Sequence, residues 1–501
     1  MAYQHGVRVL EQETSVIAPI LGTAGLQVVF GTAPVNMAED PSAVVNTPVI
    51  AYSWAEAVSK LGYSDDWNNY TLCQSMYATF KQFNVAPIIF VNVLDPAVHK
   101  TSVATPVQVN ISNKQGTLEV TGVLPSTVVI KKTTSSDAAL VLDTDYTLSF
   151  DSTGNLVITL LAGGSAATST SVYVTAYDKL NPSAVTANDI VGVSAGNTEK
   201  GLEVLRQVYP KLGMTPGLLS APGWSHLATV GTALAAKCEE INGYFRCEAF
   251  VDINSASSGG CSAYDDVNTY KNNAGITSPH VMALWPCVAV GDKKFYYSAI
   301  MSALTAYTDA TNDDVPNLSP SNRSIGATAA VLSDAVASVD SSGNVTWDKE
   351  VSLDQIQGNT VNGFGVTTLI NLNGFRSWGN NSAAYPNTTD PKDRWFCCRR
   401  FFSWWGNSFI LTYFQKVDRP ASTQLIESIV DSENIRGNAY VATGKCAGAR
   451  IEFNSAENPV TDLLNGKITF HQHLAPWTPA EDIVDILEFD PDTLAAALTG
   501  G

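Results

Sequence analysis

The run Ile88-Ile-Phe-Val-Asn-Val93 is apolar at almost every position, so both faces of a strand formed there would be buried. Leu26-Gln-Val-Val-Phe30 has the same character, and such runs are typical of strands in a parallel sheet covered on both sides. Between them, Ser53 and Glu56 have capping-box spacing for a helix that would end at Gly62. This strand–helix–strand order predicts an α/β core.

The same alternation returns in the second half of the chain. Strands are predicted at 217–221, 245–251 and 281–290, and helices at 199–209, 225–243, from 262 and at 295–307. Strands that alternate with helices of 10–15 residues indicate βαβ units and a mainly parallel sheet. Ser225 is interpreted as the cap of its helix and His226 as a surface residue.

Residues 101–180 differ sharply in composition from their flanks. They contain 24 Ser or Thr and 11 Val, with no Trp, Cys or His, and short alternating runs separated by Gly, Pro, Asp and Asn. This pattern is typical of an antiparallel β-sandwich or small barrel. We therefore expect an all-β domain inserted into the α/β core.

The last 130 residues predict an α+β region. An aromatic stretch covers 395–402, a helix is expected from Pro420 to about Gly437, and strands are expected at 467–474 and 483–489. The expected layout is an N-terminal arm (1–24), the first part of the α/β core (25–96), the inserted β domain (97–182), the second part of the core (183–370), and a C-terminal α+β domain ending in an extended arm (371–501).

Composition excludes several classes of protein. The chain has 501 residues, 45% hydrophobic and only 15% charged, which does not suit a disordered protein. No apolar run reaches the about 18 residues of a transmembrane helix, and the start lacks a signal-peptide core, so we expect no membrane insertion and no export by that route. The formal charge of −18 argues against nucleic-acid binding.

Candidate chemistry is sparse. The eight cysteines include no CxxC pair, and adjacent Cys397 and Cys398 would lie on opposite faces of a strand. His471 and His473 would share one strand face, but no further ligand with metal-site spacing accompanies them. No nucleophile elbow or phosphate-binding loop is present. We expect no enzyme activity, no cofactor and no metal.

Several stretches, in order, resemble the sheath proteins of contractile phage tails and phage-derived tail particles. They are His5–Glu11, Gly25–Pro34 with Ser53–Gly62, Asn371–Asn380 with Asp393–Arg400, and Asn465–Phe489. Only the β insert lies outside the resemblance.

The resemblance implies a subtilisin-like core and a structural function. The subunit would polymerise as stacked hexameric rings around a tail tube and contract to drive that tube through a cell envelope. Partners would be other copies, the tube, baseplate and terminator proteins, in a virion or tail-like particle assembled in the bacterial cytoplasm. Energy would be stored in the extended lattice at assembly. The alternatives are a hydrolase of subtilisin-like fold or a surface-layer protein.

Two surfaces are expected to carry assembly. Both termini have strand patterns with apolar residues on both faces, which indicates pairing with strands of neighbouring copies rather than solvation, with folding back on the same subunit as the alternative. The residues are Val7, Arg8, Val9 and Leu10 at one end and Ile483, Val484, Ile486, Leu487 and Phe489 at the other. The resemblance also implies a tube-facing helix, best matched by residues 420–434 with Glu427, Asp431 and Glu433 outward.

Overall fold

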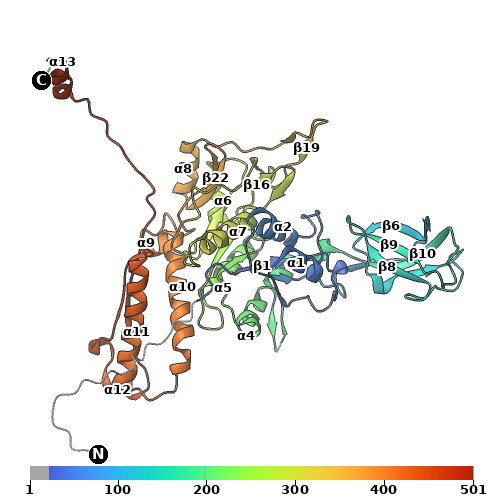
Figure 1. Cartoon of the computed structure of the whole chain (residues 1–501), viewed down its shortest axis with the longest axis horizontal. Helices are drawn as coiled ribbons and strands as arrows, with labels where there is room; N and C mark the ends of the chain where they lie inside the picture. Colours follow the sequence, from blue (N-terminus) through green and yellow to red (C-terminus); the bar gives the residue numbers. More distant parts are fainter. Residues whose placement is uncertain (1–21, 197, 500–501) are drawn as a thin grey trace, which may run out of the picture.

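A computed structural model describes residues 22–196 and 198–499 and places an eight-stranded sheet at the centre (Figure 1). The strand order is β2-β3-β1-β13-β14-β15-β21-β22. The strands are β1 (Gln27–Gly31), β2 (Pro48–Ala51), β3 (Ile88–Asn92), β13 (Leu218–Ser220), β14 (Glu248–Asp252), β15 (Val281–Leu284), β21 (Val366–Asn371) and β22 (Phe375–Trp378). The strands from β3 to β21 pair in parallel, whereas β2 and β22 pair antiparallel at the two edges. All residues of β1 and β3 are buried, as their apolar runs predicted.

Helices and short helical turns connect these strands. They are α1 (Trp54–Leu61), α2 (Leu72–Tyr77) with η2 (Ala78–Gln82), α3 (Ala187–Val191), η5 (Gly201–Gln207), α4 (Val208–Leu212), α5 (Ala228–Glu239), α6 (Val267–Asn273), α7 (Tyr297–Ala310) and α8 (Gln355–Gly363), with single turns η1 (Val35–Met37), η3 (Pro125–Thr127) and η4 (Pro182–Ala184). The Ser53 cap is confirmed, because its side chain accepts a hydrogen bond from the Glu56 amide and Gly62 ends α1 with φ of 72°. A mixed α/β fold with several sheets is therefore confirmed.

Some predicted boundaries were wrong. The helix expected at 199–209 is split into η5 and α4, and Pro210 lies inside α4. The strand expected at 281–290 is two strands, because β16 (Cys287–Val290) leaves the main sheet and pairs with β17 (Lys293–Phe295) and β18 (Ala329–Val331). Two short hairpins complete this part, β11 (Ser194–Ala195) with β12 (Thr198–Glu199) and β19 (Ala337–Val339) with β20 (Val345–Trp347).

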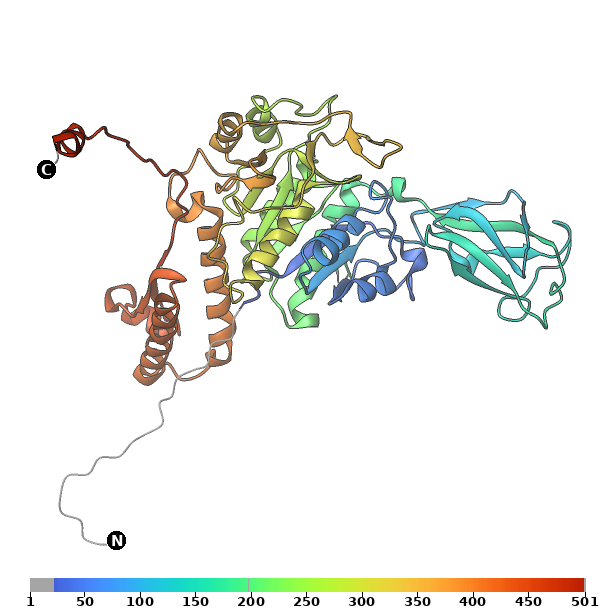
Figure 2. The same ribbon diagram turned by 45° about the horizontal axis from the view of Figure 1, so that its top comes forward.

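Residues 100–180 form seven strands that project sideways from the main sheet (Figure 2). β4 (Lys100–Val103), β5 (Val107–Asn110) and β7 (Val129–Lys131) all pair with the long β10 (Ser171–Leu180), and β9 (Asn155–Leu160) pairs with β6 (Gln115–Thr121) and β8 (Tyr146–Phe150). Their inward side chains make a separate apolar core that includes Leu118, Ile130 and Ile158. The chain enters and leaves this β domain at neighbouring residues, since the Asn181 amide donates to the His99 carbonyl over 2.8 Å.

The C-terminal part is built on two long helices that lie beside each other (Figures 1 and 2). Its elements are α9 (Pro391–Arg394), α10 (Phe396–Tyr413), η6 (Phe414–Lys416), α11 (Thr423–Ala442), β23 (Cys446–Glu452), η7 (Ser455–Glu457), α12 (Val460–Leu464), β24 (His471–Pro476) and α13 (Pro491–Thr499). Cys397 and Cys398 are on a helix, so the strand considered for them was wrong. Helical spacing suits this stretch because its side chains pack against the core along one face.

Gly437 was also misinterpreted as the end of a helix. It lies within α11, where an added Cβ would approach the Ala449 carbonyl oxygen of β23 to 2.3 Å. The glycine is required for this close approach of strand and helix rather than for chain reversal.

Removal of the β insert is predicted to leave the rest of the chain folded. Replacing residues 101–179 by a short Gly-Ser linker should preserve the unfolding transition of the α/β core, because the two cut ends are already adjacent and the insert has its own apolar core. Circular dichroism and thermal unfolding of the shortened chain measure this. Insoluble or unfolded protein would show that the core requires the insert.

Candidate assembly site

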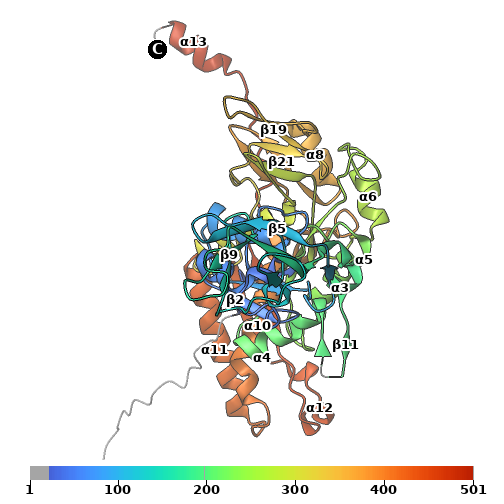
Figure 3. The ribbon, with the colours of Figure 1, turned by 90° about the vertical axis from the view of Figure 1, so that its right-hand side faces the viewer.

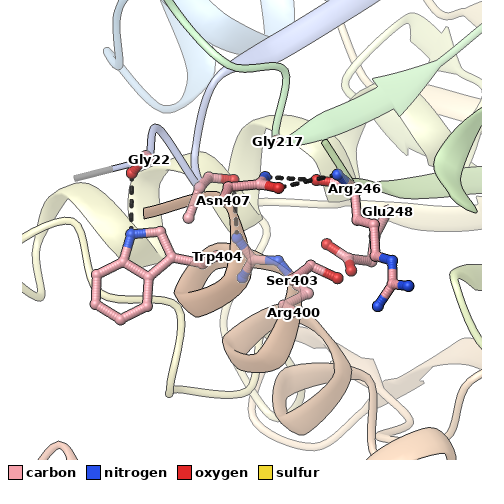
Figure 4. A pocket seen from close by; sticks show the side chains of 9 residues that line it. Gly22, Gly217, Arg246, Glu248, Arg400, Ser403, Trp404 and Asn407 are labelled. Atoms are coloured by element: carbon pink, nitrogen blue, oxygen red, sulfur yellow. Dashed lines mark hydrogen bonds between the residues drawn. The ribbon is translucent and has the colours of Figure 1, made fainter. Parts of the chain in front are cut away.

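Helix α10 holds the first described residues of the chain against the core. The Trp404 indole N–H donates to the Gly22 carbonyl over 2.9 Å (Figure 4). The Gly22 amide donates to Ser408 Oγ over 2.9 Å. One residue later, the Thr23 amide donates to Thr215 Oγ1 over 3.0 Å. Gly22 and Thr23 are therefore held by three side chains, Trp404, Ser408 and Thr215, from two distant segments.

A buried ion pair lies one turn earlier on the same helix. The Arg400 guanidinium is 1% exposed and makes a two-pronged contact with the carboxylate of Asp309, close to the end of α7. It also donates to the Ala24 carbonyl over 3.2 Å. Burial raises the pKa of the Asp309 carboxyl, and the charge of Arg400 opposes that shift. Arg400 thus ties α10, α7 and the N-terminal segment together.

The space around this ion pair is too small for a ligand. The cavity lined by Arg400, Glu248, Ser403 and Trp404 has a volume of about 10 Å³, close to the space one water occupies (Figure 4). Beside it, Asn407 exchanges two hydrogen bonds with the main chain of Arg246, over 2.9 and 2.7 Å. These contacts indicate a packing joint between α10 and the sheet rather than a binding pocket.

Helix α11 is attached to α10 through aromatic rings and through Arg436, whose charge is paired within α11. Trp404 and Trp405 both contact the ring of Tyr440, with centroids 5.3 and 5.6 Å away. The Arg436 guanidinium lies 3.9 Å from the centroid of a Trp405 ring and donates to Glu433 over 3.1 Å.

This arrangement corrects one proposed surface residue. Glu433 is 1% exposed, so it is not an outward charge, and its carboxylate serves instead as the partner of Arg436. Glu427 and Asp431 are exposed on α11. The i,i+3 spacing permits this ion pair, but no local pattern in the sequence shows that Glu433 and Arg436 are buried.

Strands β23 and β24 form a two-stranded antiparallel sheet that has no further strand among the described residues. The outer edge of β24 therefore has unpaired main-chain groups. A groove of about 490 Å³ runs beside it, with Phe402 of α10 and Leu474 and Pro476 of β24 in its walls. An unpaired strand edge next to an apolar groove is the geometry that accepts an added strand.

His471 and His473 share one face of β24, as predicted, with ring centroids 4.7 Å apart. One ring nitrogen of each histidine faces a glutamate carboxylate. His471 Nδ1 lies 3.1 Å from Glu457 Oε1, and His473 Nε2 lies 3.4 Å from Glu452 Oε1. No cluster of three or more His, Cys, Asp or Glu that could hold a metal occurs in residues 22–196 and 198–499. The pair is better explained as a hydrogen-bonded surface face.

The C-terminal arm leaves the body beside α9. Arg394 donates to Glu481 over 2.9 Å, and its guanidinium also lies 4.0 Å from the centroid of a Trp395 ring. Beyond this point the apolar side chains are open to solvent, with Ile483 85% and Leu487 88% exposed, and Val484, Ile486 and Phe489 similar.

Figures 1 and 3 show the arm and α13 extending away from the body. In this structure the C-terminal arm does not fold back on its own subunit, and its pairing with neighbouring copies stays a prediction. The N-terminal arm residues Val7, Arg8, Val9 and Leu10 lie outside the described residues.

A serine, a histidine and an aspartate do approach one another near the ends of the parallel strands. Ser225 Oγ donates to Asp252 Oδ2 over 2.7 Å, and the amide of Ser298 donates to Oδ1 of the same carboxylate over 2.9 Å. Asp252 thus caps the start of α7, and burial raises its carboxyl pKa. Ser225 is not the cap of α5, because that position is Leu227.

His226 does not complete a catalytic set. Its ring stacks on Tyr296 with centroids 5.5 Å apart, and burial lowers its pKa, so it is not the surface residue expected. No hydrogen bond between His226 and Ser225 or Asp252 occurs in the described part of the chain. A serine nucleophile needs a base within hydrogen-bond reach, so this geometry does not favour acyl transfer.

The thiols and helices give no other functional signal. All eight cysteines are free and buried, and burial raises the pKa of Cys73 and of Cys287 to about 12. Among the helices of the described ranges, none combines the length and apolarity that crossing a membrane requires.

The aromatic stretch at 395–402 was visible in the sequence, but the contacts of its two arginines, Arg399 and Arg400, were not. The available signal was the spacing of Phe396, Arg400, Trp404 and Ser408, which recur every four residues and therefore line one helix face. A charged residue in such a stripe indicates a buried partner.

Comparison with known proteins gives one consistent result, although no protein-family model matches the chain. It is 26% identical to the tail sheath protein of Burkholderia phage BcepMu over 507 residues, covering 100% of this chain and 99% of that protein. It is 24% identical to the tail sheath protein of Escherichia phage P2 over 312 residues, covering 60% of this chain and 70% of the relative.

Solved structures share the fold across nearly the whole chain. A sheath complex of an extracellular contractile injection system in its contracted state has a TM-score of 0.56 at 13% identity, with 99% of both chains covered. A chain in the baseplate of the anti-feeding prophage has a TM-score of 0.54 at 14% identity, covering 98% of this chain and 100% of that one.

Replacement of Arg400 is predicted to destabilise the protein strongly. Arg400→Met leaves Asp309 buried without a partner, which typically costs about 3–5 kcal/mol of the free energy of unfolding. Urea unfolding of the two single variants and of Arg400→Met with Asp309→Leu completes a double-mutant cycle. The free energy of unfolding should fall less in the double variant than in Arg400→Met alone. A decrease in the double variant equal to the sum of the two single decreases would contradict the ion-pair assignment.

Proposed function

We propose that this chain, a homologue of phage tail sheath proteins, is the repeating subunit of a contractile sheath in a virion or tail-like particle. The observation that carries this is the match of the entire chain, end to end, to a tail sheath protein. The hydrolase and surface-layer alternatives gain no support from either the comparisons or the side-chain geometry. The role we propose is structural rather than catalytic.

The exposed C-terminal arm supports assembly by strand exchange. Five large apolar side chains between Ile483 and Phe489 are exposed, and such a segment is unfavourable in water unless another surface covers it. The open edge of β24 with its apolar groove is a suitable acceptor. We propose that the arms of neighbouring copies, including Val7–Leu10, add strands to this edge.

Such links would keep subunits joined while they move. An arm held at its root by one partly exposed ion pair, Arg394–Glu481, would allow its subunit to rotate relative to the acceptor. We propose stacked hexameric rings around a tail tube, with baseplate and terminator proteins at the ends and assembly in the bacterial cytoplasm. Contraction would then release energy stored in the extended lattice, without a nucleotide or other cofactor.

We also propose where each domain of the subunit lies in the sheath. The parallel sheet and its helices would correspond to the subtilisin-like core of the sheath family, and the β domain that projects from it would lie on the outer surface of the sheath. The helices α10 and α11 would then lie toward the tube, since they occupy the opposite side of the core from the insert (Figure 2).

Truncation tests the strand-exchange proposal. Chains that lack residues 1–11, or that end after Pro479, should be folded monomers because they lack an arm but keep every buried contact described above. Negative-stain electron microscopy should show long hollow tubes for the full chain and none for either truncation. Tubes from a truncated chain would contradict strand exchange, and compact particles from the full chain would contradict the sheath function.

Charge reversal tests the tube-facing helix. Glu427→Lys with Asp431→Lys should reduce co-assembly with the tube and leave sheath self-assembly unchanged, because both carboxylates are exposed and have no cation partner among the described residues. Each exposed ion pair contributes about 0–1 kcal/mol, so the effect depends on repetition along the tube and should shrink with salt. Co-sedimentation of the variant with tubes at two salt concentrations measures it. Binding equal to wild type would reject this helix as the tube contact.

A further inference from the structure

A second groove, formed by elements other than β24, has chemistry that the proposed function does not use. It has a volume of about 510 Å³, and α7, η2, β22 and the 322–326 loop form its walls. Phe83, Leu304 and Tyr307 supply apolar surface, and the rings of Phe83 and Tyr307 are in contact with centroids 6.1 Å apart. Tyr307 is 41% exposed.

Two arginines flank this apolar surface. Arg323 donates through Nε to the Ser319 carbonyl over 3.2 Å, and Arg376 donates to the Asn322 carbonyl over 3.0 Å. Neither guanidinium has a carboxylate within 4.0 Å among the described residues. Most of their N–H groups therefore remain available, and two unpaired arginines at one groove are notable in a chain with a charge of −18.

Helix α13 has the complementary chemistry. It has nine residues, lies at the end of the exposed arm, and has Leu494 and Leu498 on one face because they are four residues apart. Glu488 and Asp492 flank its start, in a segment with six acidic and no basic residues. Isolated helices shorter than about 12–15 residues are marginal in water, so α13 needs a surface to pack on.

We propose that α13 of a second copy docks in this groove, which we call the arginine groove (Phe83, Leu304, Tyr307, Arg323 and Arg376). Leu494 and Leu498 would pack on the two aromatic rings and Leu304, with the negative charge of Glu488 and Asp492 at the start of the helix near the two guanidinium groups. Helix α13 of the same chain lies at the end of the extended arm, away from α7 and β22 (Figure 1). This contact would be separate from strand exchange, and it depends on the proposed function only in requiring a second copy.

Cross-linking tests the contact directly. All eight native thiols are buried, so a cysteine pair introduced as Tyr307→Cys and Leu494→Cys should react specifically with a short bismaleimide. We expect covalent dimers and longer ladders on a denaturing gel. The control pair, Tyr209→Cys on α4 with Leu494→Cys, has an equally exposed tyrosine position outside the groove and should give none.

The possible results separate the two proposals. A ladder of cross-linked chains supports docking between copies. A cross-link within one chain, or no cross-link in assembled tubes, overturns the docking proposal but does not contradict the sheath function. A ladder in protein that forms no tubes would support the docking contact and contradict the sheath function.

Charge reversal provides a second readout that does not need new cysteines. Arg323→Glu with Arg376→Glu, or Glu488→Lys with Asp492→Lys, should each weaken self-association about threefold to tenfold, because two exposed ion pairs become repulsive. Mixing the two variants should restore association between unlike copies. Arg206→Glu with Lys211→Glu makes the same charge change outside the groove and should have no such effect. Association equal to wild type in both groove variants would overturn the proposal.

Asp490 is left unchanged because its carboxylate caps α13 through the amides of Asp492 and Thr493.

Discussion

The buried contact between Arg400 and Asp309 is the interaction on which the arrangement of the C-terminal helices depends. Removing both charges from water is unfavourable, and only the two-pronged geometry compensates for it, so α10 has little freedom to slide along α7. Through the Ala24 carbonyl and the neighbouring Trp404–Gly22 bond, the same helix also holds the root of the N-terminal segment. Arg436, which is paired with Glu433 within α11, then attaches α11 to α10 through the ring of Trp405.

This centre contrasts with the end of the chain. Every apolar side chain between Ile483 and Phe489 is exposed, and the arm is attached to the body at Glu481 by one partly exposed ion pair. A rigid body with a loosely attached apolar arm suits a subunit that must remain linked to its neighbours while their relative positions change. The joint at Arg400 encloses only about 10 Å³, so it offers no room for a substrate.

Charge sets a further condition on assembly. Subunits that each have a formal charge of −18 repel at long range, so close packing needs places where opposite charges meet. The arginine groove and the acidic end of the chain are two such surfaces, and their separation on the subunit favours contacts between copies over contacts within one. Ionic contacts of this kind are individually weak and are screened by salt, so they become effective by repetition in a lattice.

The sequence by itself determined the α/β class, the strands β1, β3 and β13, the capped helix α1 and the β-rich composition of residues 101–180. These features are encoded locally, since apolar runs, caps and alternation act over a few neighbouring residues. The order of motifs also indicated the relationship to sheath proteins. Tertiary structure alone decided the burial of Glu433, the passage of α11 through Gly437, the role of Asp252 as a cap, and the pairing of Arg400 with a residue 91 positions away. Contacts between segments so distant in sequence depend on how helices and strands pack, and no local pattern specifies which partner a buried charge will meet.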